Sequence, residues 1–242
     1  MERVVYDRMA ELDQRHWWYR ARREVLAALI RRRALPPPGA RMLEVGCGTG
    51  HNLAMLAEFG TVEAIEVDPA ARAVAEQRLG RAVGSAPLPA LDGVPSHAFD
   101  LIGSFDVIEH IQDDDAALVS VARCLKPGGR FIMTVPAHGW MWSAHDVVNH
   151  HKRRYSKAGL ERLVDASPLK LEALGYFNSL LFPLAVGARV AGKLTGKQDS
   201  DDKLPPAPLN RALEIVFAHE ARLIGRVPLP PGLSLFAVAS AI

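Results

Sequence analysis

Short apolar segments with the length of β-strands alternate with helical segments through the first half of the chain. They begin after the turn signal Pro36-Pro37-Pro38-Gly39, which a helix does not cross. Strands that are apolar along their length and separated by helices are typical of a parallel sheet covered on both faces. The strands that we expect here lie at residues 42–45, 62–67, 81–83, 99–105 and 130–135.

The second half of the chain has a weaker pattern that still predicts two more strands, at residues 169–177 and 233–242. The whole sequence therefore predicts a mostly parallel α/β sheet of seven strands. Apolar positions at helical spacing predict the helices. The longer ones lie at residues 4–33, 113–125, 157–166, 178–194 and 209–225.

The composition excludes several classes of protein. The chain has 242 residues, with 29 basic and 27 acidic side chains, a balance that argues against a dedicated nucleic-acid binder. A hydrophobic share of 49% argues against disorder. Two cysteines are too few for a disulfide framework or a four-cysteine zinc site. Because neither a signal sequence nor a membrane span is evident, we expect a cytoplasmic protein.

A glycine-rich loop is the main candidate for a binding site. Gly46, Gly48 and Gly50 stand between a strand and a helix, and Glu66 ends the next strand, 20 positions after Gly46. Glycines let a ligand approach the backbone closely, and a carboxylate at that strand end can accept both ribose hydroxyls of a nucleoside. A tight turn without a ligand, and a solvated carboxylate, are the alternatives.

Two residues beside the loop bear on the kind of nucleoside. His51 occupies the position of the third glycine of the dinucleotide fingerprint. Glu44 lies two residues before the loop, where a carboxylate suits a positively charged ligand. S-adenosylmethionine carries an ammonium and a sulfonium group and no phosphate. These residues favour it over a nicotinamide dinucleotide, which stays open as an alternative.

Four blocks of sequence, in order, resemble the class I S-adenosylmethionine-dependent methyltransferases. The first is Leu-Glu-Val-Gly-Cys-Gly-Thr-Gly at residues 43–50, and the second is Ile-Glu-Val-Asp-Pro at residues 65–69. The others are residues 99–110 around the fourth strand and Leu-Lys-Pro-Gly-Gly at residues 125–129. The resemblance covers residues 40–136. It implies a Rossmann-like fold for residues 36–242 and an N-terminal helical lid at 1–35. It also implies an inserted cap segment after the fifth and sixth strands, with acceptor-side elements at about 137–155 and 178–225.

The resemblance also implies which residues bind S-adenosylmethionine. The glycine loop would line the methionine part, Glu66 would bind the ribose and Val67 would pack on the adenine. The family often has an acid after the third strand, but this chain has Ser85 and Ala86 there. Trp17 packs on the sheet or covers the cofactor as part of the lid. The cofactor-binding residues that we expect are Glu44, Gly46, Cys47, Gly48, Gly50, Glu66, Val67, Ser85, Ala86, Ser104, Phe105 and Trp17.

Histidines gather in the parts of the sequence that should approach the acceptor. Four of the nine lie within residues 138–151, after the fifth strand. A neutral imidazole is a suitable base near neutral pH. We expect His145 first, and His110 second, to be catalytic, although each has a structural alternative. The spacing of the histidines matches no usual set of metal ligands, so no metal is expected.

The sequence therefore predicts in-line methyl transfer to a small-molecule acceptor, with an apolar or lipid-like one included. The apolar segment 178–194, which contains Arg189 and is followed by Lys197, would then touch the acceptor or a membrane surface. Nucleic-acid and protein acceptors are disfavoured. The main alternative is a non-catalytic binding or scaffold protein with the same fold, and a nicotinamide oxidoreductase is a weaker one.

Overall fold

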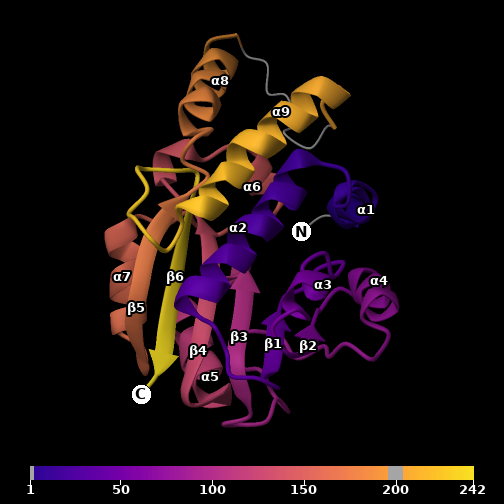
Figure 1. Ribbon diagram of the computed structural model, residues 1–242, viewed down its shortest axis with the longest axis vertical. Helices are drawn as coiled ribbons and strands as arrows, with labels where there is room; N and C mark the ends of the chain where they lie inside the picture. Colours follow the sequence, from indigo (N-terminus) through magenta and orange to yellow (C-terminus); the bar gives the residue numbers. More distant parts are fainter. Residues whose placement is uncertain (1–2, 196–203) are drawn as a thin grey trace.

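A computed structural model describes residues 3–195 and 204–242, and in this part of the chain a mixed sheet of six strands forms the centre (Figure 1). The strand order is β2-β1-β3-β4-β6-β5. Strands β1 to β4 pair in parallel, and β6 runs antiparallel to both of its neighbours. The strands are β1 (Arg41–Val45), β2 (Thr61–Ile65), β3 (Phe99–Phe105), β4 (Leu125–Pro136), β5 (Leu169–Phe177) and β6 (Ser234–Ala241).

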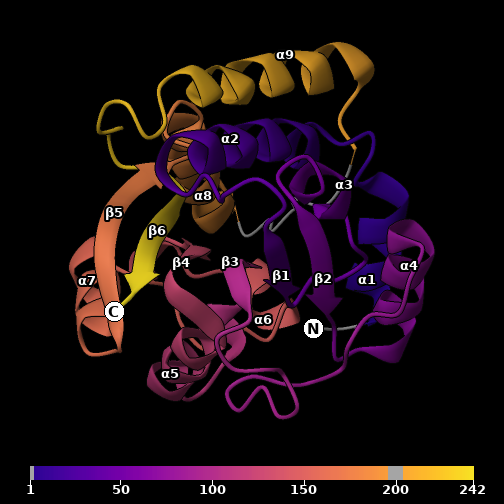
Figure 2. The same ribbon diagram turned by 60° about the horizontal axis from the view of Figure 1, so that its bottom comes forward.

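The helices form a layer on each face of this sheet (Figure 2). On one face, α2 and α9 bury their apolar sides in one core cluster, and on the other, α5 and α7 line a second cluster. The helices are α1 (Arg3–Leu12), α2 (Trp17–Arg33), α3 (Leu53–Leu56), α4 (Pro69–Leu79), α5 (Asp114–Cys124), α6 (Ala144–Val148), α7 (Lys157–Asp165), α8 (Phe182–Thr195) and α9 (Ala207–Ala218). Three single turns of 3₁₀ helix are η1 (Ile108–His110), η2 (Gly139–Met141) and η3 (His219–Arg222).

The expected seventh strand is wrong in the described residues. Residues 81–83 form no ladder, and a single bridge between Ile65 and Gly84 replaces it. A backbone hydrogen bond from Glu66 N to Gly84 O, 2.9 Å long, continues this contact. The segment is too short and polar to build a strand, but it still runs along the outer edge of β2. Ser85 and Ala86 therefore leave the sheet beside Glu66.

The expected single helix at residues 4–33 is also wrong. It is interrupted after Leu12, and a new helix starts at Trp17 with His16 as its N-cap. The His16 Nδ1 atom accepts a hydrogen bond from Trp18 N at 3.2 Å, which satisfies one of the free N–H groups of the new helix. As a result, α1 and α2 run in different directions, with α2 on the sheet and α1 near α3 and α4 (Figure 1).

Because β1 to β4 are parallel, the loops that follow them emerge at one edge of the sheet, here called the carboxyl edge. The segment from Ala137 to Tyr155, which contains α6, folds over this edge and is closed at its base by a bridge between those two residues. The end of β5 reaches the same edge, since Phe177 pairs with Ser234 and Ser234 pairs with Pro136. No helix in the described ranges has the length and hydropathy that a membrane crossing needs.

Glu220 of η3 fixes the turn after β5. Its buried carboxylate accepts backbone hydrogen bonds from Asn178, Ser179 and Leu180, at 2.6, 2.6 and 2.8 Å. These three N–H groups follow the last strand residue and have left the ladder. In the described residues these N–H groups have no partner strand, and the Glu220 carboxylate accepts their hydrogen bonds instead. It thereby fixes the backbone that leads into α8.

We predict that Glu220→Ala lowers the free energy of unfolding by about 3 kcal/mol, because it leaves three buried or half-buried N–H groups without acceptors. Glu220→Gln keeps one acceptor oxygen and should lose less. Urea denaturation measures both. Glu161→Ala, at an exposed position of α7, is the control and should change stability by about 0.5 kcal/mol or less. A loss for Glu220→Ala no larger than that of the control would contradict this account.

Candidate functional site

The glycine loop after β1 folds in a way that only glycine allows at two positions. Gly46 has φ +72°, and a Cβ there would lie 2.6 Å from Val107 Cγ2. Gly50 has φ +81°, and a Cβ there would lie 2.7 Å from Leu53 Cδ1. The backbone of the glycine loop therefore packs closely against Val107, in the loop after β3, and against Leu53 of α3, and it lies at the carboxyl edge of the sheet. The expectation of a sharp strand-to-helix turn holds.

Glu66, just after β2, holds this loop from the side. One carboxylate oxygen accepts the N–H of Gly48 at 2.8 Å, and the other accepts the N–H of Asp68 at 2.8 Å. Asp68 in turn caps α4 through Ala70 N and Ala71 N, both at 2.9 Å. Each oxygen of Glu66 keeps a second lone pair. The carboxylate is therefore fixed in place and still able to accept hydroxyl groups from a ligand.

Beside the loop lies a group of buried polar atoms that have no hydrogen-bond partner in the part of the chain that the structure describes. Native proteins satisfy most such atoms, so a cluster of them calls for an explanation. A bound polar molecule is the simplest one, because it supplies the missing donors and acceptors together. The atoms are Glu44 Oε2, Thr49 Oγ1, His51 Nδ1, Asn52 Oδ1 and Ser104 Oγ.

Glu44 is the most costly member of this group. Its other oxygen accepts a hydrogen bond from Asn52 Nδ2 at 2.8 Å, and the side chain is buried. Burial raises the pKa of Glu44 to about 8, and the negative charge of Glu66 adds to the rise. A positively charged group beside it would offset both effects. In contrast, burial lowers the pKa of His51 to about 3, so that imidazole is neutral at ordinary pH.

Helix α1 lies across the glycine loop. A Cβ at Gly48 would lie 3.2 Å from Met9 Sδ. Burial, and then the carboxylates of Glu66 and Asp68, raise the pKa of Tyr6. Between α1, Thr49 and α4 the structure leaves a cavity of about 160 Å³. Small-molecule sites are usually about 300 Å³ or larger, so this cavity, which Tyr6, Asp7 and Ala10 of α1 help to line, is smaller than such a site.

Arg22 of α2 was not identified from the sequence, and it is buried next to the site. Its guanidinium donates to Asp106 Oδ2 and to Thr134 Oγ1, both at 2.7 Å, and stacks over Trp18 at 4.9 Å from the ring centre. Asp106 has φ +59°, which turns the chain sharply after β3. The only sequence signal was an arginine on the apolar face of a helix. The ion pair ties α2 to the ends of β3 and β4.

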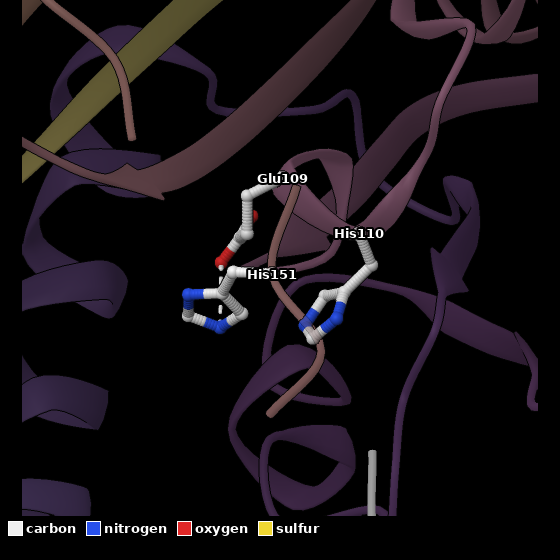
Figure 3. A group of neighbouring side chains, drawn as sticks. All are labelled: Glu109, His110 and His151. Atoms are coloured by element: carbon white, nitrogen blue, oxygen red, sulfur yellow. Dashed lines mark ion pairs between the residues drawn. The ribbon is translucent and has the colours of Figure 1, made fainter. Parts of the chain in front are cut away.

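A second group of polar side chains lies on the acceptor side of the carboxyl edge (Figure 3). Glu109 is fully buried, and neither carboxylate oxygen has a hydrogen-bond partner among the described residues. His151 Nε2 lies 4.0 Å from Glu109 Oε1, and the rings of His110 and His151 lie 4.7 Å apart. Burial, together with the charge of Asp106, raises the pKa of Glu109, and burial lowers that of His110 to about 4.

Asp146 orients this group. It accepts hydrogen bonds from His151 Nδ1 at 2.9 Å and from Arg154 Nε at 2.7 Å, and it caps α6 through Ser143. The sequence placed Asp146 next to His145, but the side chain pairs with His151 instead. His145 is exposed, and its ring lies 6.1 Å from that of His151. His151 is therefore the histidine that lies inside the site, and His145 lies at its surface.

Apart from Trp17, the remaining residues expected to bind the cofactor lie after β2, at the end of β3 and in the glycine loop. Val67 is 55% exposed at the end of β2, with Ser85 and Ala86 on the neighbouring loop. Ser104 and Phe105 are buried at the end of β3, while Cys47 is buried within the glycine loop. All of these lie at the carboxyl edge.

Trp17 lies elsewhere. Its ring packs edge-on against Phe217 of α9 at 6.1 Å, which supports the packing alternative for this residue. The N-terminal residues that do approach the loop are Tyr6, Met9 and Tyr19, whose ring lies 5.2 Å from that of His51. The helix break at residues 13–16 causes this difference, because it sends α1 toward α4.

Comparison with known proteins gives a match to the methyltransferase domain family model over residues 17–174. A probable S-adenosylmethionine-dependent methyltransferase of Mycolicibacterium smegmatis is 28% identical over 175 residues, which are 69% of this chain and 65% of the relative. A ubiquinone biosynthesis O-methyltransferase of a Bradyrhizobium strain is 30% identical over 109 residues, which are 42% of each chain. The matched region thus spans less than two thirds of these relatives.

Solved structures with the same fold include enzymes with the cofactor or its product bound. Phosphoethanolamine N-methyltransferase 2 of Haemonchus contortus, in complex with S-adenosylmethionine, has a TM-score of 0.56 and 21% identity over 89% of this chain and 51% of that one. Geranyl diphosphate C-methyltransferase of Streptomyces coelicolor, in complex with Mg²⁺, geranyl diphosphate and S-adenosylhomocysteine, has a TM-score of 0.56 and 15% identity over 88% of this chain and 77% of that one. At these identities the likeness shows the fold alone.

We predict that Arg22→Met lowers the free energy of unfolding by about 3 kcal/mol, because it leaves Asp106 and Thr134 without the buried guanidinium. Methionine keeps most of the apolar contact with Trp18. The matched control is Arg31→Met on the same helix, which breaks an exposed ion pair with Glu58 and should cost about 0.5 kcal/mol. Urea denaturation of both variants is the measurement, and equal losses would show that the buried pair adds nothing.

Proposed function

Because this chain belongs to the class I S-adenosylmethionine-dependent methyltransferase family, we propose that it catalyses methyl transfer from S-adenosylmethionine to a small-molecule acceptor. The observation that carries the proposal is the group of unsatisfied buried polar atoms around the glycine loop. Its chemistry fits this cofactor, since Glu44 offers a carboxylate to a cationic ligand and Glu66 offers lone pairs to ribose hydroxyls.

We propose roles for the loop residues on this basis. Glu44 and the backbone of Gly46 and Gly48 would hold the methionine part, and Ser104 and Phe105 would lie beside the sulfur. Glu66 would hold the ribose. The exposed apolar side chain of Val67, with Ser85 and Ala86 opposite, would hold the adenine. S-adenosylmethionine supplies an already activated methyl group, so the residues contribute mainly by positioning the two reactants in line.

A base for a hydroxyl acceptor is available on the acceptor side. His151 is oriented by Asp146, and burial keeps His110 neutral at ordinary pH. Either imidazole can accept a proton from an acceptor that reaches the carboxyl edge. We therefore propose His110 and His151 as the candidates for the base, with His145 at the exposed rim.

The surroundings favour a flat or apolar acceptor. His138 stacks on Tyr176 at 5.4 Å and on Phe182 at 5.1 Å, and Trp140, next to His138, is 56% exposed. Leu184 of α8 is exposed as well. Isoprenoid compounds are named for two of the similar proteins, the ubiquinone and the geranyl diphosphate enzymes. Lys197, which the sequence suggested as a further contact for the acceptor or a membrane surface, lies outside the described residues.

We also propose that α1 acts as a lid over the cofactor. Met9 of α1 lies against Gly48, and the cavity of about 160 Å³ between α1, Thr49 and α4 is smaller than usual small-molecule sites, so α1 would shift outward when the cofactor binds. Its polar attachment includes an ion pair between Asp13, just after α1, and Arg78 of α4, at 2.5 Å. The break at residues 13–16 lets α1 move while α2 stays on the sheet.

The first prediction concerns cofactor binding. S-adenosylmethionine or S-adenosylhomocysteine at about 100 times the dissociation constant should stabilise the protein by roughly 2.7 kcal/mol, which is about 5–10 °C in melting temperature. Glu66→Ala should abolish the shift, because the carboxylate also fixes the loop. Glu63→Ala, three residues earlier in β2 and with its carboxylate paired to Arg41, is the control and should keep the shift. Thermal melting with each nucleoside, and with NAD in parallel, measures this.

The outcomes separate the candidate functions. A shift with both sulfur nucleosides supports the proposal, and a shift with NAD alone overturns it in favour of an oxidoreductase. Binding without methyl transfer to any acceptor of a panel of phenols, carboxylic acids, amines and isoprenoid alcohols would favour a binding or scaffold protein.

A second prediction concerns the pH dependence of binding. Since the pKa of Glu44 is about 8 without ligand, a cationic ligand must displace its proton at lower pH. The affinity for S-adenosylmethionine should therefore rise from pH 6.5 to 8.5, by up to about tenfold per pH unit. Glu44→Gln should flatten this rise. Calorimetric titration in buffers of different ionisation enthalpy measures the proton released, and no release from the wild type would contradict the role of Glu44.

The same raised pKa has a consequence for stability. A carboxyl whose pKa is higher in the folded than in the unfolded protein favours folding less as pH rises from its usual value of about 4.5 toward 8. In the ligand-free protein, Glu44→Gln should therefore be more stable relative to the wild type at pH 8 than at pH 5, by urea denaturation.

A further inference from the structure

Three side chains with the chemistry of metal ligands meet on the acceptor side, although they come from segments that lie far apart in the sequence. Glu109 and His110 belong to η1, after β3, and His151 follows α6 (Figure 3). One ligand atom from each lies within 4.8 Å of the others. A hydrogen bond from Lys152 N to Glu109 O, 2.8 Å long, joins the two segments. This backbone hydrogen bond keeps the three side chains close together.

The carboxyl group of Glu109 gives an independent sign of a missing partner. It is 0% exposed, and neither oxygen accepts a hydrogen bond within the described ranges. A buried carboxyl without a partner is costly, and proteins retain one where a ligand or a function compensates for it. A cation that contacts Glu109 would remove this cost in one step.

The orientation of His151 suits such a cation. Because Nδ1 is bound to Asp146 at 2.9 Å, the other ring nitrogen, Nε2, is left facing Glu109 at 4.0 Å. A carboxylate that fixes the distal nitrogen of a histidine is the usual arrangement behind a metal-binding imidazole. Arg154 holds Asp146 at 2.7 Å, so this support is itself rigid.

The charges around the group also favour a cation. The carboxylates are those of Asp106, Glu109 and Asp146, and the facing cationic side chains are Arg22 and Arg154. Three carboxyl groups thus face two guanidinium groups, an excess of acidic groups that favours a bound cation.

We propose that Glu109, His110 and His151 bind a divalent first-row transition-metal ion, with Asp146 as the residue that positions His151. Two imidazoles and one carboxylate, with further coordination positions open, are a set that Zn²⁺, Fe²⁺ and related ions accept. Bonds of about 2.1 Å place ligand atoms about 3.4 Å apart. The separation of 4.0 Å between Glu109 and His151 must therefore shorten by about 0.6 Å, and the others, which lie within 4.8 Å, by up to about 1.4 Å, through side-chain rotation on binding.

The open positions of this ion would face the carboxyl edge. There it would bind an oxygen atom of the acceptor, a hydroxyl or carboxylate, and lower the pKa of a bound hydroxyl, whose proton would pass to water. His110 and His151 would then act as ligands of the ion and not as bases. This role rests on the proposed methyl transfer, whereas the metal site itself does not. Sequence spacing gave no sign of it, because the ligands come together only when the segment after β4 folds back over the end of β3.

The test uses untagged full-length protein treated with a chelator and then titrated with Co²⁺. We expect one ion per chain, with visible d–d absorption of a site that contains nitrogen ligands, and displacement of Co²⁺ by Zn²⁺. Glu109→Gln and His151→Gln should each weaken binding at least 100-fold. Asp146→Asn should weaken it about 10- to 100-fold through the orientation of His151. His150→Gln, which removes a neighbouring exposed histidine, is the matched control and should leave binding unchanged.

The outcomes are separable from those of the methyltransferase proposal. Melting curves establish that each variant is folded, and calorimetric titration with S-adenosylmethionine is run on the same samples. Cofactor binding without tight Co²⁺ binding would overturn the metal site alone and leave a metal-free histidine base. Co²⁺ binding that is weakened equally by His150→Gln would also overturn it, because the ion would then bind at the surface. Metal binding without cofactor binding would overturn the proposed function and leave the metal site standing.

Discussion

The burial of carboxyl groups at the carboxyl edge of the sheet is the constraint on which the site depends. Burying a charge is costly unless it is paired, and the carboxyl groups here differ in how many hydrogen-bond partners they have. Glu66 accepts two backbone N–H groups, and Asp146 is paired with His151 and Arg154. Glu44 has one partner, Asn52, and Glu109 has none in the described part of the chain. The satisfied carboxylates build the frame, and the unsatisfied ones mark where ligands are expected.

Arg22 connects the two unsatisfied carboxyls. Its positive charge acts to lower the pKa of both Glu44 and Glu109, although burial outweighs it in each case. The guanidinium is itself bound to Asp106, between the loop side and the acceptor side. Arg22 belongs to α2, so this helix, and not the sheet, supplies the positive charge between the two carboxyls. A ligand that neutralises one of these carboxyls would therefore change the electrostatic potential at the other.

The sequence predicted the parts of the fold that depend on local pattern. The strands at 99–105 and 169–177 and the helix after Pro69 are confirmed, because apolar runs and caps are properties of adjacent residues. The choice of His151 over His145, and the burial of Arg22, depend on pairing between segments far apart in the chain. The strand expected at 81–83 was wrong because these residues pair with no strand in the described ranges, and the bridge to β2 is made by the next residue, Gly84. Local periodicity contains none of this information.

The break between α1 and α2, which periodicity also missed, would allow α1 to move from the glycine loop, as proposed, while α2 stays on the sheet. If one straight helix ran from residue 3 to residue 33, moving its start would disturb Arg22 and the core beneath it. The turn at Asp13–His16 would confine the proposed movement to α1, whose attachment includes the contact of Met9 with the loop and the pair of Asp13 with Arg78. The Arg78 side chain is 26% exposed, so water can replace part of that pair when it opens. In this proposal the interruption between α1 and α2 separates the part of the N-terminal region that moves from the part that stays on the sheet.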